Sequence, residues 1–371
     1  MAIYFESKKL SVGYEGKALI KDIDISLEKG RILTLIGPNG AGKSTILKSI
    51  TRQLDIIGGT VYIGEDELSR MSQKNLAKQM AVVLTDRIRP ELMSCEEVVA
   101  MGRYPYTNMF GKLTPQDKQA VSDALKKVNA QDLAQQDFMT LSDGQRQRIM
   151  LARAICQQPQ IIVLDEPTAY LDIRHKVELL DILREMAHNG ITVIMSLHEI
   201  DLAVKISDLL LCVKGSHIAA FGTPEEILKE NTIDNLYQID KGSYNLLFGS
   251  VELAKPKGNP KVFVVAGLGR GIACYRNLQK KEIPFATGII FENDVDFQVA
   301  KDLSDFVVAS PAFEMPTEKE FEKAVQIMQD CTAVIDAGTP IGTFNSINQR
   351  LLNAAKQKNI PIYTSDKFLE I

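Results

Sequence analysis

The stretch from Gly37 to Thr45 (GPNGAGKST) contains the residue types that a phosphate-binding loop needs. It follows the apolar run Ile32 to Ile36 and precedes the amphipathic run Ile46 to Ile50, a pattern that predicts a strand, a loop and a helix. Glycines let backbone N–H groups turn toward an anion, and the N-terminus of the following helix adds positive potential. Lys43 supplies a charge for the β- and γ-phosphates, and Ser44 is the expected ligand of Mg²⁺. The spacing therefore predicts that the chain binds a nucleotide.

A pair of carboxylates, Asp165 and Glu166, follows the apolar run Ile161 to Leu164. In proteins with a phosphate loop, an acidic residue at the end of such a strand holds Mg²⁺, which is the role we expect for Asp165. Glu166 is the candidate general base, because an attacking water needs a positioned acceptor for its proton. The alternative is an ordinary solvated strand end, and the phosphate loop upstream argues against it.

The composition is that of an ordinary globular protein. The chain has 371 residues, of which 45% are hydrophobic and 24% charged, so it can form two or three packed domains. A formal net charge of −4 gives no overall basic field, and nucleic acid is not expected as a partner. The first residues lack the pattern of an export signal, and the apolar runs are of strand length. Five scattered cysteines without a CxxC pair favour free thiols in a reducing cytosol.

The order of the expected elements predicts a mainly parallel sheet. Short antiparallel strands are expected from Ile3 to Gly30, and helical periodicity runs from Cys95 to Gln158 as an insertion. A strand at Ile161 to Leu164, a helix at Arg174 to His188 and a strand at Ile191 to Ser196 then alternate. Ligands bind at the carboxyl ends of strands in such sheets. The residues expected at those ends are Gly37, Asp165 and His198.

The stretch Leu141 to Arg148 (LSDGQRQR) looks like the LSGGQ signature of ABC transporters, placed at the start of a helix. With the phosphate loop and the acidic pair, the chain resembles the nucleotide-binding subunits of these transporters over about residues 1–253. The resemblance implies that Ser142 and the backbone at Gly144 contact the γ-phosphate bound by a second copy. A helix N-terminus that offers N–H groups to an anion gives this role a physical basis. Taken alone, Ser142 and Asp143 would be an ordinary helix cap.

The resemblance also assigns the remaining site residues. Tyr14 would stack on adenine, Tyr170 to Asp172 would form the loop that crosses the dimer interface, and His198 would be the switch histidine. The implied ATP contacts are Tyr14, Gly37, Asn39, Gly40, Gly42, Lys43, Ser44, Thr45, Ser142, Gly144, Gln145 and Asp172. The implied Mg²⁺ contacts are Ser44, Asp165 and Thr85, and the implied catalytic residues are Lys43, Glu166 and His198.

Two positions depart from the family pattern. Asp143 replaces the first signature glycine and places a carboxylate where a γ-phosphate should lie, so its side chain must point away or make its own contacts. Thr85 stands where the family normally has a glutamine that senses Mg²⁺, and a threonine hydroxyl spans that gap only through a bridging water. An inactive family member is the alternative, but because Lys43, Glu166 and His198 are present we expect an active ATPase.

Within the family, the stretches Met101 to Tyr106 and Thr114 to Asp117 look like those of importer ATPases for iron-siderophores, haem and cobalamin. This resemblance implies a homodimer that works with two permease subunits and a substrate-binding protein, in the cytoplasm on the inner face of the cell membrane. The helical region, residues 95–158, is the expected docking surface for the permease. A soluble ABC ATPase of DNA repair or translation, and an exporter, remain as alternatives.

A second domain is expected after a Pro/Gly/Lys linker at residues 254–260. Residues 261–371 alternate strands and helices as a small Rossmann-like α/β domain. Its turn, Gly267 to Gly271, misses the GxGxxG fingerprint at Ile272, and Glu292 comes later than the usual acidic residue. A small bound anion or nucleotide, or a purely structural turn or dimer contact, are the open interpretations. Our hypothesis is a regulatory domain. A nicotinamide-dependent enzyme is disfavoured, because no histidine follows residue 217.

The expected fold class is therefore α/β. It combines an ABC-type phosphate-loop NTPase, which has an antiparallel β subdomain and an inserted helical subdomain, with a small C-terminal Rossmann-like domain.

Overall fold

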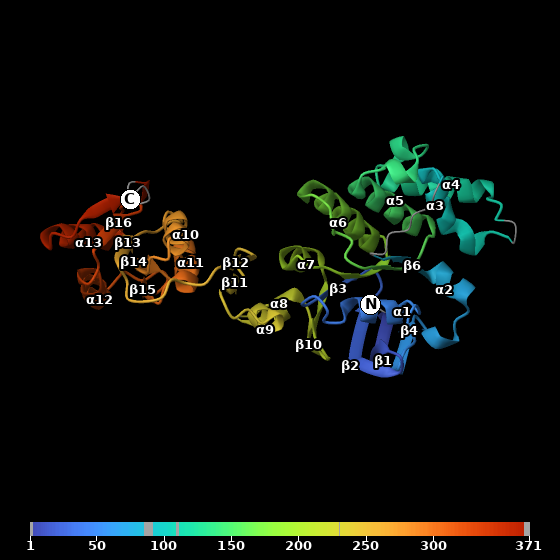
Figure 1. Ribbon diagram of the computed structural model, residues 1–371, viewed down its shortest axis with the longest axis horizontal. Coiled ribbons are helices and arrows are strands. Elements are labelled where there is room, and N and C mark those ends of the chain that lie inside the picture. Colours follow the sequence, from blue (N-terminus) through green and yellow to red (C-terminus); the bar gives the residue numbers. More distant parts are fainter. Residues whose placement is uncertain (1–2, 85–91, 109–110, 230, 367–371) are drawn as a thin grey trace. The chain divides into compact units, whose positions relative to one another are not determined.

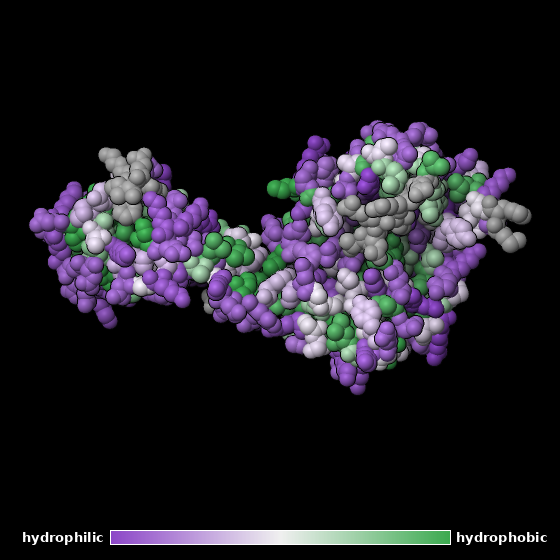
Figure 2. Space-filling view, viewed as in Figure 1, coloured by the Kyte–Doolittle hydropathy of each residue, from purple (hydrophilic) through white to green (hydrophobic). Residues whose placement is uncertain are grey.

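The computed structural model describes residues 3–84, 92–108, 111–229 and 231–366. The chain divides into two compact units, Met1–Thr232 and Ile233–Ile371, and each is described by itself (Figure 1). Hydrophilic residues cover most of the face of each unit that Figure 2 shows, with hydrophobic patches between them. None of the helices in the described ranges is long and apolar enough to cross a membrane.

The first unit begins with an antiparallel sheet of order β2-β1-β4-β5. β1 pairs with β2 through a two-residue turn in which Glu15 and Gly16 both have positive φ, the geometry that matches the twist of a hairpin. Buried and exposed residues alternate along β2, as expected where one face is covered. The strands are β1 (Ile3–Tyr14), β2 (Lys17–Glu28), β4 (Gly58–Ile63) and β5 (Asp66–Glu67).

A second sheet, of order β10-β9-β3-β8-β7-β6, forms the centre of this unit. Neighbouring strands from β9 to β6 run parallel, and every residue of β3, β7 and β8 is buried, which explains their continuous apolar sequences. Its strands are β3 (Ile32–Ile36), β6 (Met80–Val83), β7 (Ile161–Leu164), β8 (Thr192–Ser196), β9 (Leu209–Lys214) and β10 (His217–Gly222). One hydrophobic core contains Leu10, Ile46 and Val163, so the phosphate-loop helix α1 (Lys43–Ile50) packs with both sheets.

The helical insertion is confirmed. It contains α3 (Cys95–Ala100), η2 (Met101–Tyr106), α4 (Pro115–Lys127), η3 (Gln131–Leu133), η4 (Phe138–Thr140) and α5 (Asp143–Cys156). Figure 1 shows α3, α4 and α5 packed together. The Nε of Arg103 lies 2.8 Å from Oδ1 of Asp117, and both side chains are buried, so this ion pair fixes η2 to α4. The other helices of the unit are η1 (Leu68–Arg70), α2 (Gln73–Gln79), α6 (Ile173–His188), α7 (Ile200–Ile206) and α8 (Pro224–Ile227).

The second unit is built on a five-stranded parallel sheet of order β15-β14-β13-β16-β17. One hydrophobic core lies under α12 and α13 and another under α10 and α11, so helices cover both faces and the predicted Rossmann-like fold is confirmed. The strands are β13 (Val262–Val265), β14 (Phe285–Phe291), β15 (Phe306–Ser310), β16 (Ala333–Asp336) and β17 (Ile362–Thr364). The helices are α10 (Ile272–Lys280), α11 (Val295–Leu303), α12 (Glu318–Gln329) and α13 (Ser346–Gln357).

The division of the chain falls earlier than the expected linker at residues 254–260. α9 (Thr232–Tyr237) lies at the boundary, and a hairpin of β11 (Ser243–Asn245) and β12 (Ser250–Glu252) belongs to the second unit. The buried Asn245 amide donates to Oδ2 of Asp302 at 2.8 Å, and the buried Glu252 pairs with Arg276. These polar side chains join the hairpin to α10 and α11, and the short strands gave no periodic signal that would have predicted it.

Candidate functional site

The loop between β3 and α1 has a backbone that only glycine can adopt at two positions. Gly37 has φ of 147°, and a Cβ there would lie 2.1 Å from the carbonyl oxygen of Val213. Gly42 has φ of 101°, and a Cβ there would lie 2.6 Å from Ile20. The glycine spacing of the sequence is therefore required by the turn that leads from the strand into the helix.

Lys43 reaches back across this loop. Its Nζ donates to the carbonyl oxygens of Gly37 at 2.7 Å and Pro38 at 3.1 Å. Burial lowers the pKa of Lys43, and the nearby carboxylates of Glu166 and Asp165 partly offset that effect. The ammonium group of Lys43 thus lies inside the glycine loop. A phosphate bound there would stabilise its positive charge, which burial has deprived of water.

A cavity of about 430 Å³ opens over the loop, within the size range of ligand sites. The ring of Tyr14 is half exposed at 51%, and its hydroxyl lies 3.0 Å from Oγ1 of Thr45. Leu19, which the sequence did not single out, also lines the cavity. The predicted site residues that the cavity brings together are Tyr14, Asn39, Gly40, Gly42, Lys43, Ser44, Thr45, Glu166 and His198.

The carboxylates after β7 are held by Ser196, the last residue of β8. Its Oγ donates to Oδ1 of the buried Asp165 at 2.6 Å and accepts from the N–H of Glu166 at 2.9 Å. Nε2 of His198 lies 2.5 Å from Oε1 of Glu166. Sequence reasoning missed Ser196, although a polar residue at the end of a buried strand was the available signal.

The donors beside the loop match the needs of Mg²⁺. Ser44 offers a hydroxyl in the cavity, and Asp165 offers a carboxylate at the end of β7, which β8 separates from β3. Mg²⁺ commonly takes one or two protein oxygens and completes its shell with phosphate and water. Thr85, the third predicted contact, lies outside the described residues.

Among the described residues, a second group of predicted contacts lies outside the lining of this cavity. Ser142 caps α5, accepting from the N–H of Gln145 at 3.3 Å, while Oε1 of Gln145 accepts from the N–H of Ser142 at 2.9 Å. Asp172 caps α6 and lies 2.8 Å from Nδ1 of His175. A Cβ at Gly144 would lie 3.4 Å from the His175 ring. His175, which the sequence gave no role, therefore packs between the starts of α5 and α6.

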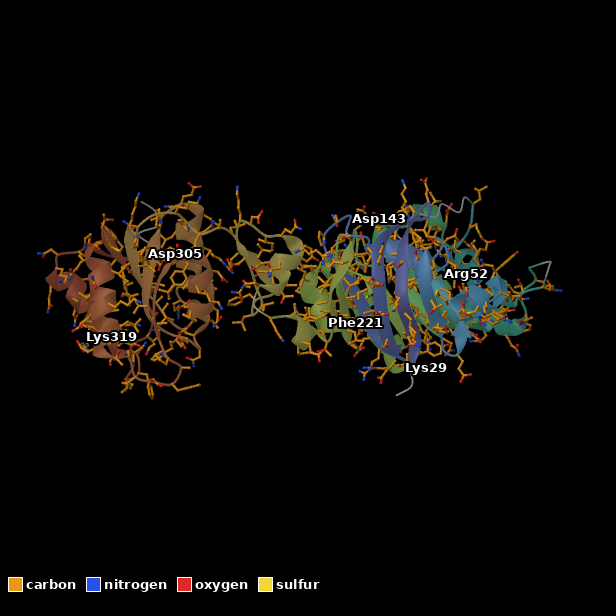
Figure 3. All side chains as sticks on the ribbon, turned by 90° about the horizontal axis from the view of Figure 1, so that it is seen from below. Lys29, Arg52, Asp143, Phe221, Asp305 and Lys319 are labelled. Atoms are coloured by element: carbon orange, nitrogen blue, oxygen red, sulfur yellow. The ribbon has the colours of Figure 1, made fainter. Side chains whose placement is uncertain are left out.

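Asp143 makes its own contact, one of the two outcomes that the sequence left open. Its Oδ1 lies 3.5 Å from Nη1 of Arg146, one turn further along α5. The side chain is 48% exposed at the surface of the first unit (Figure 3). The carboxylate is thus paired along its own helix.

A glycine loop at the end of a buried parallel strand, with a lysine inside it and an acidic strand end beside it, defines a phosphate-loop NTPase. Comparison with known proteins gives the family. Residues 20–169 match the model of the ABC transporter family, and residues 285–370, in the second unit, match the MJ0874 family.

Relatives and solved structures agree with this. An ABC transporter ATP-binding protein of Methanocaldococcus jannaschii is 40% identical over 285 residues, which are 76% of this chain and 98% of the relative. The iron(3+)-hydroxamate import ATP-binding protein of Bacillus subtilis is 35% identical over 63% of this chain and 87% of its own length. The cobalamin import ATP-binding protein of Halobacterium salinarum is 30% identical over 301 residues, or 79% of this chain and 75% of the relative.

A solved structure described as a metal-chelate type ABC transporter in an inward-facing conformation matches with a TM-score of 0.57 and 29% identity. The match covers 63% of this chain and 89% of that chain. The chain belongs to the ATP-binding protein family of ABC transporters, and it binds and hydrolyses ATP.

Proposed function

We propose that the chain is the ATP-hydrolysing subunit of an importer that takes up a metal chelate, such as an iron-siderophore, haem or cobalamin, through a separate membrane permease. The observation that carries the ATPase chemistry is the single cavity that joins Lys43 and the glycine loop to Glu166 and His198. The hydroxamate and cobalamin import proteins among the relatives support import as the direction.

The cavity residues suggest how hydrolysis proceeds. The triphosphate lies in the glycine loop beside Lys43, and the half-exposed ring of Tyr14 stacks on adenine. Mg²⁺, held by Ser44 and Asp165, would neutralise charge on the phosphates. Glu166 accepts the proton of the attacking water, and His198, 2.5 Å away, holds the carboxylate in place. Most of the rate enhancement then comes from positioning and electrostatics.

The second group of predicted contacts completes the site from another copy of the chain. Ser142, Gly144, Gln145 and Asp172 lie at the starts of α5 and α6, where helix N-termini can contact an anion. Near them Tyr170, Ile173 and Val177 are 74%, 81% and 57% exposed, an apolar surface that is costly unless it is covered. A head-to-tail homodimer with two sandwiched ATP molecules would cover this surface.

The helical insertion is the proposed docking surface for the two permease subunits. Tyr104 is 78% exposed and Met101 46% exposed, whereas Arg103 between them is buried and paired with Asp117. The buried ion pair presents the neighbouring apolar side chains on a rigid turn. Peripheral placement on the inner face of the membrane, and a substrate-binding protein outside, follow from this assignment.

Among the metal chelates, we take a corrinoid as the working cargo. The alignment with the Halobacterium salinarum cobalamin protein runs over 301 residues and that with the hydroxamate import protein over 235, so the first extends further beyond the 232 residues of the first unit. Uptake of labelled cobalamin and of ferric hydroxamate by cells with and without this chain would test the cargo. Loss of hydroxamate uptake with cobalamin uptake intact would contradict the corrinoid assignment.

The base assignment is tested by Glu166→Gln, with Glu178→Gln on the exposed side of α6 as the matched control. We expect the first change to lower steady-state ATP hydrolysis by about a hundredfold to ten-thousandfold, because the amide cannot accept the proton. ATP should remain bound and stabilise a dimer that size-exclusion chromatography detects. The control should hydrolyse ATP normally. Hydrolysis by Glu166→Gln at the wild-type rate would show that another group is the base.

A further inference from the structure

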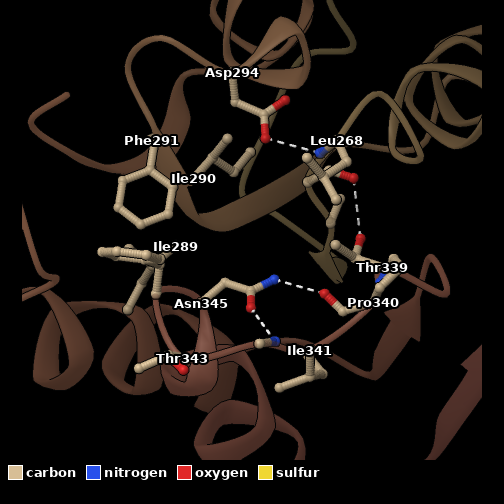
Figure 4. Close-up of a pocket in the computed structure, with 14 residues that line it drawn as sticks. Leu268, Ile289, Ile290, Phe291, Asp294, Thr339, Pro340, Ile341, Thr343 and Asn345 are labelled. Atoms are coloured by element: carbon tan, nitrogen blue, oxygen red, sulfur yellow. Dashed lines mark hydrogen bonds between the residues drawn. The ribbon is translucent and has the colours of Figure 1, made fainter. Parts of the chain in front are cut away.

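The second unit contains a cavity of about 330 Å³ that the ATPase does not use. It lies at the carboxyl ends of β13, β14 and β16 (Figure 4). The chain passes from β13 to β14 on one side and later returns to β16 on the other, so the cavity lies where the strand order reverses. Ligands of open α/β sheets bind at this position. A volume at the low end of the usual range suits a small ligand rather than a dinucleotide.

The N-terminus of α10, where a dinucleotide would place its phosphates, is already occupied by a carboxylate of the protein. Asp296 is fully buried, and its oxygens accept from the N–H groups of Gly271 at 3.0 and 3.1 Å and of Ile272 at 3.1 Å. A carboxylate in this position satisfies the amides that would otherwise bind an anion. A phosphate at α10 would have to displace it.

A second carboxylate makes the cavity itself unfavourable for anions. Asp294 lines the cavity, and its Oδ2 accepts from the N–H of Leu268 at 2.8 Å while Oδ1 accepts from the N–H of Asp296 at 2.9 Å. Figure 4 shows this carboxylate above the glycine turn. A carboxylate after the second strand of such a sheet is the group that accepts hydrogen bonds from ribose hydroxyls.

Most of the remaining side chains of the cavity wall are apolar, and hydrogen bonds hold the loop after β16 in place. Ile289, Phe291, Ile341 and Phe344 contribute to its walls, and the last two are 42% and 71% exposed. Asn345 holds the second loop, donating to the carbonyl of Pro340 at 2.8 Å and accepting from the N–H of Gly342 at 2.6 Å.

The two loops are also tied to each other, because Oγ1 of Thr339 donates to the carbonyl of Gly267 at 3.1 Å (Figure 4). A rigid cavity with exposed aromatic and aliphatic side chains is suited to a planar ring, since burial of those side chains would favour binding.

We propose that the second unit binds a nucleoside or a molecule of similar size, with a planar ring and hydroxyl groups but no phosphate. The ring lies between the apolar walls and the hydroxyls donate to Asp294. This site is separate from the ATP site and goes beyond the proposed transport function, because it assigns a ligand class to the second unit.

The test is calorimetric titration of the full-length chain with adenosine, AMP and NAD⁺. Adenosine should bind at least about tenfold more tightly than AMP, because the phosphate of AMP meets two carboxylates. NAD⁺ should bind no better than AMP. Phe344→Ala should weaken adenosine binding, and the control Phe313→Ala, 92% exposed and outside the cavity lining, should leave it unchanged.

Tyr14→Ala separates this site from the ATP site. Adenosine binding that survives Tyr14→Ala and is lost in Phe344→Ala supports the proposal. Binding lost in Tyr14→Ala but kept in Phe344→Ala would place adenosine in the ATP site and overturn it. The proposal also fails if AMP or NAD⁺ binds as tightly as adenosine and Phe344→Ala abolishes that binding. It fails as well if no adenosine binding is detected at millimolar concentration.

Discussion

Two glycine loops follow strands of the two main sheets of this chain, yet the side chains that bond to the backbone of these loops carry opposite charges. Each follows a buried strand, β3 or β13, and precedes a helix, α1 or α10. In the first unit the side chain inside the loop is the cation Lys43. In the second unit it is the anion Asp296, which accepts from the first amides of the helix. The charge beside the loop therefore decides which ligand the strand–loop–helix arrangement can bind.

The backbone conformation at the start of the helix also differs between the two loops. Gly42 precedes α1 in a left-handed conformation, without a side-chain cap. Gly271 precedes α10 in a right-handed conformation, and its N–H is held by Asp296. A glycine-rich sequence alone does not distinguish a loop that cradles phosphate from one whose helix is capped by the protein itself.

The largest effect is expected from removing the cation of the first loop. Lys43→Ala should lower ATP hydrolysis by at least about a hundredfold, because a buried positive charge next to the phosphates is lost. Arg270→Ala, which removes the cation of the second glycine loop, should leave ATP hydrolysis unchanged. Steady-state phosphate release by both variants is the measurement. Equal losses in the two variants would mean that the loops do not act separately.

A smaller effect is expected at Ser196, which positions both carboxylates of the first unit. Ser196→Ala removes the donor to Asp165 and the acceptor for the N–H of Glu166, so ATP hydrolysis should fall about tenfold to a hundredfold. The loss should be partly restored by Ser196→Thr, which keeps the hydroxyl. Thr287→Val in the second unit removes a buried hydroxyl that bonds Val264 and Tyr275, and hydrolysis should not change. An active Ser196→Ala enzyme would show that the strand ends alone fix the carboxylates.

Local patterns predicted most of the fold. The mainly parallel sheet of the first unit, its helical insertion and the Rossmann-like domain followed from apolar runs, helical periodicity and glycine turns, because β3, β7 and β13 are buried on both faces and read as continuous apolar sequences. The ABC type of the ATPase fold followed from the resemblance to that family. The helix α11 was not predicted, and neither was the β11–β12 hairpin. The hairpin strands have three residues each and depend on polar contacts with residues distant in sequence, such as Asn245 with Asp302. For α11 the signal was available, because it buries Val299, Ala300 and Leu303 at helical spacing.

The candidate site was less visible in the sequence. Motif spacing placed Gly37, Asp165 and His198 at strand ends, and the structure brings Lys43, Glu166 and His198 to one cavity. Ser196 and His175 were missed, because their contacts depend on which strands and helices are neighbours in space. The roles assigned by resemblance, including those of Ser142 and Asp172 across a dimer, stay predictions.

The carboxylate of the second loop can be tested by its effect on local stability. Asp296→Asn should destabilise the start of α10 by about 1.5–3 kcal/mol, because the amide has an NH2 group in place of Oδ2, which accepts from the N–H of Gly271. Hydrogen exchange in peptides covering residues 267–281 should accelerate about tenfold to a hundredfold. Asp305→Asn, at an exposed position, is the matched control and should have little effect. Unchanged exchange in Asp296→Asn would show that this carboxylate does not hold the helix.

The effect of Asp296→Asn on the stability of α10 should also depend on pH. Burial raises the pKa of Asp296 above its ordinary value of 3.8, and the hydrogen bonds from Gly271 and Ile272 oppose that rise. Because the folded pKa lies above the unfolded one, the stability that this group contributes is complete below pH 3.8 and decreases as the pH rises through the folded pKa. The difference in exchange protection between wild type and Asp296→Asn should therefore widen as the pH falls toward 3.8. A difference that narrows on acidification would reverse the assigned direction.

The smallest effect is expected at Asp143, the other carboxylate at a helix start where an anion is expected. Asp296 is buried and bonded to helix amides, whereas Asp143 is 48% exposed and paired with Arg146. Because Asp143 does not cap the N–H of Gln145, which donates to Ser142, Asp143→Gly should change ATP hydrolysis by no more than about threefold. The free energy of unfolding should fall by about 1 kcal/mol or less, from the lower helix propensity of glycine. A tenfold faster enzyme would instead show that this carboxylate repels the γ-phosphate, as the two acids of the second loop are expected to repel the phosphate of AMP.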